Sequence, residues 1–266
     1  MPADMAALAA DLAAESAVTR ALVADLNETG WHMPTPAVGW DIADQISHLA
    51  YFDEVTVRSA VHPEEFKADL AAAHDGVNPD EIAARFRDRT GEQLLAWFDT
   101  ARAELLAIFA AMDPKARLPW FGPPMSAASS LTARLMETWA HTQDIADALG
   151  VTREPTVRLR HVAHIGVGAR AFSYAARGQV RPDTPVRVEL TAPDGTQWTW
   201  GPDDAGNRVT GTALDFCLLV TQRRHRDDLD LIVDGAAAQE WMAIAQAFAG
   251  PPGPGRPPIG PEIQPA

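Results

Sequence analysis

The chain has 266 residues, 47% hydrophobic and 22% charged, a balance typical of a globular protein with one or two domains. Its net charge of −14 opposes binding to nucleic acid or to an anionic membrane. There is no apolar run of 18 residues, and the start carries an acid where a secretory signal carries base, so neither a membrane span nor a signal is expected. The single cysteine excludes an internal disulfide framework. These features favour a soluble cytoplasmic protein.

The first two thirds of the chain are predicted to be helical, because apolar residues recur there at helical spacing. Asn78-Pro79 is a typical helix start, and Gly150 is a typical stop. A break is expected near Gly91, and a loop rich in proline and glycine covers 118–128. The predicted helices cover 4–28, 40–61, 78–112, 128–149 and 156–177.

Beyond residue 180 the pattern changes to the period of two that strands show. Strands are predicted over 186–190 and 196–200, joined by a hairpin at Asp194-Gly195. A helix over 211–221, a strand over 229–233 and a helix over 235–249 follow. The predicted fold class is therefore α+β. It comprises a helical bundle over 1–180, a smaller α/β domain over 181–250 and an extended Pro/Gly-rich tail over 251–266.

Three residues on two of the predicted helices form a candidate metal-binding set. Glu137 and His141 lie one turn apart on one helix face, and His48 lies beside the apolar stripe of another helix. Two imidazoles and a carboxylate suit a divalent ion such as zinc, and three protein ligands leave one position open for catalysis. Spacing alone leaves two other interpretations open, a surface Glu–His pair and a histidine packed in the core.

Three further residues could support or compete with this set. Asp144, one turn beyond His141, is predicted either to accept the second N–H of that imidazole or to be a solvated acid with no function. His161 and His164 are a competing ligand pair, although packing in the core or at a domain junction suits them better.

An anionic substrate would need a local cation in so acidic a chain, and Arg223 and Arg224 are the candidates. They follow an apolar helical segment, where they either stabilise the helix C-terminus or clamp a substrate carboxylate. Cys217 lies within the same apolar segment and is expected to be a buried small hydrophobe rather than a nucleophile.

Several segments together resemble a known family. They are Gly39-Trp40-Asp41, Ser47-His48-Leu49, and Glu137-Thr138-Trp139-Ala140-His141 with Asp144-Ile145. Residues 1–150 thereby resemble the mycothiol-dependent maleylpyruvate isomerase family of the DinB-like metal-binding superfamily. The remainder resembles the C-terminal part of a subgroup known only as metal-binding, through Arg-His-Val-Ala-His at 160–164 and Thr-Gln-Arg-Arg-His at 221–225.

The resemblance implies a DinB-like four-helix bundle that holds a divalent metal, usually zinc or nickel. The family's ligands match His48, Glu137 and His141. In the isomerase, the metal binds the thiol of mycothiol, which adds to the substrate double bond, permits rotation and leaves. An important C-terminal arginine of the family matches Arg223 or Arg224.

The leading hypothesis is a zinc-dependent isomerase or thiol transferase that uses mycothiol or a similar thiol on a small acidic substrate. One alternative is a hydrolase that uses metal-bound water as its nucleophile. Another is a non-catalytic metal-containing bundle whose C-terminal domain binds a small molecule. No nucleic-acid or membrane partner is expected, and base rates favour a homodimer.

Overall fold

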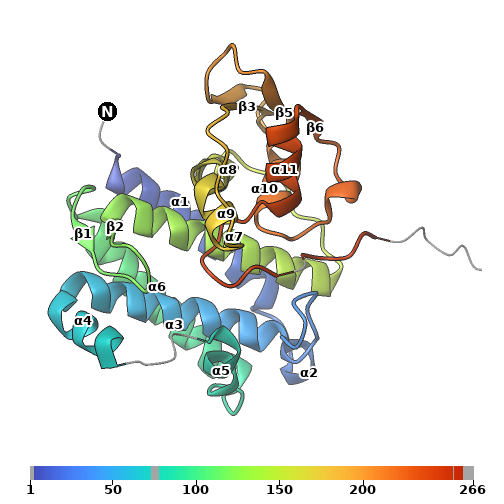
Figure 1. The fold of residues 1–266 in the computed structure, drawn as a ribbon. Helices are drawn as coiled ribbons and strands as arrows, with labels where there is room; N and C mark the ends of the chain where they lie inside the picture. The colour runs from blue at the N-terminus through green and yellow to red at the C-terminus, as the bar shows by residue number, and fades with distance from the viewer. Residues whose placement is uncertain (1–2, 73–77, 254, 260–266) are drawn as a thin grey trace, which may run out of the picture. The chain divides into compact units, whose positions relative to one another are not determined.

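Four long helices form the first part of the chain in the computed structural model, which describes residues 3–72, 78–253 and 255–259 (Figure 1). Helix α3 packs against α6 and α7, and α1 packs against the same two helices, so the four surround a common core. This is the expected four-helix bundle. The helices are α1 (Met5–Val23), α3 (Ile42–Val61), α6 (Gly91–Ala110) and α7 (Ala127–Leu149).

Short elements connect the long helices. They are α2 (Glu28–Trp31), α4 (Pro63–Ala72), α5 (Pro79–Ala84) and a two-stranded antiparallel hairpin of β1 (Arg117–Leu118) and β2 (Met125–Ser126). Helix α4 was not predicted, because only one of its residues, Phe66, is buried, so its apolar pattern is weak.

Local capping fixes where both helices of the candidate site begin and where α7 ends. Asp41 and Asp44 form a reciprocal capping box at the start of α3, and Arg87 donates to both carboxylate oxygens of Asp44 at 3.0 and 2.8 Å. Ser126 caps the start of α7, and Gly150 ends it with a φ of 66°, a conformation that favours glycine.

The segment 78–112, predicted as one helix with a break near Gly91, forms two helices, α5 and α6. The second begins at Gly91 because Thr90 and Gln93 form a capping box there. Gly91 also lies against Trp31 so closely that an added Cβ would be 2.1 Å from the indole Nε1. The break is therefore set both by capping and by packing.

A four-stranded mixed sheet forms the core of the second part of the chain (Figure 1). The strand order is β4-β3-β5-β6, in which β3 and β5 are parallel and the two edge strands are antiparallel to their neighbours. The strands are β3 (Val186–Thr191), β4 (Gln197–Trp200), β5 (Asn207–Thr212) and β6 (Ile232–Asp234). Strand β5 was not predicted, because Val209 is its one buried residue.

Helices α10 (Ala213–Val220) and α11 (Ala236–Ile244) pack on this sheet. The predicted helix over 156–177 is two helices, α8 (Leu159–Gly168) and α9 (Arg170–Ala175), which contact α10 and α11 respectively. Contacts accordingly divide the chain into Met1–Arg153 and Glu154–Ala266, earlier than the boundary near residue 180 that the sequence suggested. Among the described residues, no helix combines the length and apolar character that crossing a membrane requires.

Candidate metal centre

Helices α3 and α7 bring the three predicted ligands together. His48 projects from the middle of α3, and Glu137 and His141 lie one turn apart on α7, which packs against α3. One ligand atom from each residue lies within 4.8 Å of the other two. Among the residues that the structure describes, these three are the one group of three or more histidine, cysteine or acidic side chains arranged in this way.

The geometry of the three side chains suits a small divalent ion. Oε2 of Glu137 lies 3.2 Å from Nε2 of His141 and 3.7 Å from Nε2 of His48. Tetrahedral ligands about 2.0–2.1 Å from a zinc ion are about 3.3 Å apart. Both imidazoles therefore direct the same kind of nitrogen toward one carboxylate oxygen, at the separations that a shared ion needs. These three side chains can hold a metal ion.

A second hydrogen bond orients one of the imidazoles. Nδ1–H of His141 donates to Oε1 of Gln45, and Nε2 of Gln45 donates to the hydroxyl of Thr35 at 2.9 Å. These two hydrogen bonds orient the His141 ring so that its other nitrogen, Nε2, is directed at Glu137 and is the ring atom available to a metal. Nδ1 of His48 is buried and has no hydrogen-bond partner among the described residues.

Aromatic rings enclose the two histidines. The indole of Trp40 lies nearly parallel to the His141 ring, 5.9 Å away between centroids, and 5.3 Å from the His48 ring. Phe52 contacts His48 from the next turn of α3, at 4.7 Å. The side chains of His48 and His141 are 10% and 11% exposed, whereas that of Glu137 retains 20% exposure. The site is therefore largely dry, with its carboxylate on the more open side.

Burial controls the protonation of the site. It lowers the pKa of His48 to about 4, with a further lowering from the nearby His141. Burial alone would raise the pKa of Glu137, but hydrogen bonds from His141 and His48 outweigh it and hold that pKa well below its usual value. At neutral pH the site therefore presents a neutral His48 imidazole and a carboxylate, the protonation states that bind metals.

A buried ion network lies on the same helices. Asp53, one turn beyond Leu49 on α3, is fully buried and accepts from Nε of Arg102 at 2.6 Å and from Nε of Arg134 at 3.1 Å. Arg102 also donates to the Thr138 hydroxyl at 3.0 Å. Because Arg102 belongs to α6 and Arg134 to α7, one carboxylate joins the three helices that border or carry the ligands.

Gln45 accepts the Nδ1–H of His141 in the structure, and a role for Asp144 as an acceptor for the same imidazole stays a prediction. Asp144 is fully buried, so it is not the solvated acid that was one of its two interpretations. Of the competing histidines, His164 is exposed, and its Nδ1 accepts from Nε1 of Trp200 at 3.4 Å. Cys217 is buried as expected, and burial raises the pKa of its thiol well above the usual value.

Arg223 and Arg224 follow α10 in the C-terminal unit. Each donates from Nη1 to a backbone carbonyl at 2.7 Å, Arg223 to Thr221 and Arg224 to Arg223. Their substrate-clamping role stays a prediction.

Gln45 and Phe52 are site residues that sequence reasoning did not assign. Gln45 precedes His48 by three residues and Phe52 follows it by four, so both share its helix face. That spacing could have indicated both residues as neighbours of the histidine. The pairing of Gln45 with His141 could not be inferred, because it depends on the packing of α3 against α7.

Comparison with known proteins identifies the family to which the chain belongs. A family model described as the mycothiol maleylpyruvate isomerase N-terminal domain matches residues 12–146, which make up half of the chain and include all three candidate ligands. The chain belongs to this family. A second family model, described as wyosine base formation, matches residues 182–233 in the C-terminal unit.

Two curated relatives align over nearly the whole chain. They are uncharacterized proteins of Mycobacterium tuberculosis, from strains CDC 1551 / Oshkosh and H37Rv. Each is 49% identical over 257 residues, which cover 96% of this chain and 100% of the relative. The similarity therefore includes both units.

Two solved structures share the fold. They are the crystal structure of the mycothiol-dependent maleylpyruvate isomerase and that of a histidine-to-alanine mutant, with TM-scores of 0.56 and 0.55. Each alignment covers 84% of this chain and 91% of the solved chain at 14% identity. At that identity the likeness establishes the fold alone.

Proposed function

We propose that this protein is a divalent-metal-dependent enzyme of the isomerase or thiol-transferase type. It uses mycothiol or a similar low-molecular-weight thiol on a small unsaturated acid. The observation that carries the proposal is the approach of Nε2 of His48 and Nε2 of His141 to Oε2 of Glu137, at 3.7 and 3.2 Å. Zinc is the ion that best suits two imidazoles and one carboxylate with an open position. Membership of the family supports the choice of reaction.

An ion held by His48, Glu137 and His141 would lower the pKa of a thiol in its open position, so that the thiolate forms near neutral pH. The thiolate would add to the conjugated double bond of the substrate. The resulting single bond would rotate, and departure of the thiolate would restore the double bond in the other geometry. The protein needs no cysteine nucleophile for this chemistry, consistent with the burial of Cys217.

The surrounding side chains have distinct roles in the proposal. Gln45 keeps the His141 ring in its ligating orientation. Trp40 and Phe52 shield the imidazoles from water. Arg223 or Arg224 would supply the cation for the substrate carboxylate, a role carried over from the resemblance.

Metal analysis of the purified protein tests the proposal that His48, Glu137 and His141 bind a divalent ion. We expect close to one zinc per chain in the wild type and a loss of it in His141→Ala. His164→Ala is the matched control, because this histidine is exposed and outside the ligand set. Full metal occupancy in His141→Ala would refute the assignment of the ligands.

Activity assays of the metal-loaded protein test the proposed thiol-dependent reaction. Isomerisation of maleylpyruvate that requires added mycothiol would support the thiol mechanism. Hydrolysis without any thiol would favour the metal-bound water mechanism instead. Ligand binding with no turnover under either condition would favour the non-catalytic alternative.

A further inference from the structure

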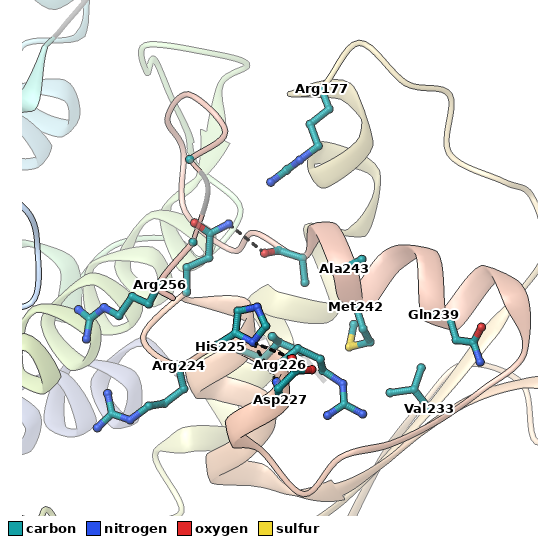
Figure 2. Close-up of a pocket in the computed structure, with 15 residues that line it drawn as sticks. Arg177, Arg224, His225, Arg226, Asp227, Val233, Gln239, Met242, Ala243 and Arg256 are labelled. Carbon is teal, nitrogen blue, oxygen red and sulfur yellow. Dashed lines mark hydrogen bonds and ion pairs between the residues drawn. The ribbon is translucent and has the colours of Figure 1, made fainter. Parts of the chain in front are cut away.

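A pocket of about 540 Å³ lies within the C-terminal unit, and no residue of the helical bundle contributes to it. Its volume falls in the range of small-molecule sites. One wall comes from the segment after α10 and another from α11, and the rest of the lining comes from the turn after α9 and from the chain around Arg256 (Figure 2). The apolar part of its lining is Leu219, Val233, Met242, Ala243 and Ala245.

The charged part of the lining is predominantly cationic. It contains four arginines, Arg177, Arg224, Arg226 and Arg256, and a single carboxylate, that of Asp227. All four arginines are half-buried. Arg224 and Arg256 point away from Arg177 in Figure 2, so the case for an anionic ligand depends on Arg177 and its neighbours.

Arg177 is the arginine best placed to contact such a ligand. Its side chain extends from the turn that follows α9 toward the side of the pocket that carries His225 (Figure 2). Nη1 donates to the carbonyl of Ser173 at 3.3 Å, which uses one of the five guanidinium donors. Among the described residues, no carboxylate oxygen lies within 4 Å of Arg177. Arg226, in contrast, donates to the carbonyls of Leu229 and Leu231 and has a structural role.

His225 adds a second donor on the neighbouring wall. Its Nδ1 accepts the backbone N–H of Asp227 at 3.1 Å, so in the neutral ring the hydrogen resides on Nε2. A donor N–H is thereby fixed on the ring that lines the pocket.

The turn that carries this wall has a strained backbone. Gln222 has a φ of 58°, the one positive φ of a non-glycine residue in the described part of the chain. It occupies the position after α10 where a Schellman motif favours glycine, because Gln222 N–H donates to Leu219 and Arg223 N–H donates to Leu218. Its Nε2 donates to the carbonyl of Ala245 at 3.2 Å, which joins two pocket walls. Strain of this kind clusters at ligand sites.

We propose that this pocket binds a small organic acid, whose carboxylate lies between Arg177 and His225 and whose apolar body lies against Leu219 and Met242. The site is built from the C-terminal unit alone, and the proposal does not rest on the metal centre. It assigns to this unit a binding function of its own.

Isothermal titration calorimetry of the metal-free protein tests the proposal with three probes. 2-Naphthoate has both an apolar body and a carboxylate, 2-naphthalenemethanol lacks the charge, and acetate lacks the apolar body. We expect 2-naphthoate to bind at least tenfold more tightly than either of the others. Equal binding of 2-naphthoate and the alcohol, or no binding of 2-naphthoate at millimolar concentration, would overturn the proposal.

Two variants locate the binding. Arg177→Gln should weaken 2-naphthoate binding by about tenfold or more. Arg181→Gln is the matched control, because Arg181 is exposed, pairs with Asp183 and is outside the pocket lining. It should leave the affinity unchanged.

NMR of the wild-type protein gives an independent readout should Arg177→Gln fail to fold. 2-Naphthoate should shift the ring resonances of His225 and leave those of His48 unchanged. The reverse pattern would place the probe at the bundle site and refute the pocket assignment. Because all these measurements use metal-free protein, failure of the proposed enzyme activity would not affect their outcome.

Discussion

Protonation of His48 should destabilise the metal-free protein as the pH falls. Burial lowers the folded pKa of this imidazole from 6.5 to about 4, so between these values the unfolded chain binds more protons than the folded one. Stability must therefore rise with pH across this window and be lost as the pH falls from about 6.5 toward 4. Applying the linkage relation to the two pKa values gives a loss of roughly 2 kcal/mol between pH 7 and pH 5.

Urea unfolding of the metal-free wild type and His48→Gln at both pH values isolates this contribution. Groups distant from His48 titrate in both proteins and cancel in the difference, and Glu137 stays ionised because its pKa lies well below 4.5. On going from pH 7 to pH 5, the free energy of unfolding should fall by roughly 2 kcal/mol more in the wild type than in His48→Gln. His62→Gln, which replaces an exposed histidine, should show the same pH dependence of unfolding as the wild type. An equal pH dependence in wild type and His48→Gln would refute the reasoning.

Three other substitutions test the structure around the site. Asp53→Asn removes the buried carboxylate that joins three helices and should lower the free energy of unfolding by about 3–5 kcal/mol, measured with urea. Gln45→Leu removes the acceptor of His141 Nδ1–H and should weaken zinc binding by about 10–100-fold, measured against a competing chelator. Gly91→Ala places a Cβ 2.1 Å from the indole of Trp31 and should destabilise the bundle by about 1–3 kcal/mol, measured by urea unfolding.

Each of these changes has a matched control. Asp99→Asn breaks the exposed pair with Arg20 and should cost less than about 1 kcal/mol. Gln197→Leu, at an exposed residue of the C-terminal sheet, should leave zinc affinity unchanged. Gly168→Ala meets no atom within 4 Å and should cause no loss of stability. If a control lost as much stability or zinc affinity as its test variant, the role assigned to Asp53, Gln45 or Gly91 would be wrong.

Helical periodicity was enough to locate α1, α3 and α7, because apolar residues recur at helical spacing in each, even though polar residues share their buried faces. Strand β5 was not predicted because only one of its residues is buried, so its sequence does not alternate between apolar and polar residues. The ligands His48, Glu137 and His141 were recognisable from residue type and helical position. The network of Asp53 with Arg102 and Arg134 was not, since buried ion pairs between distant helices leave no local pattern in a sequence.

The candidate ligands are divided between α3 and α7, and this has a consequence for how the protein matures in the cell. His48 precedes His141 by 93 positions, so at usual translation rates the first imidazole is synthesised roughly 5–20 s before the last. Nascent α3 carries one ligand only and cannot capture an ion tightly by itself. We therefore expect the metal ion to bind only after both helices have been translated and the bundle has closed. A bound ion would then indicate that the N-terminal half has folded completely.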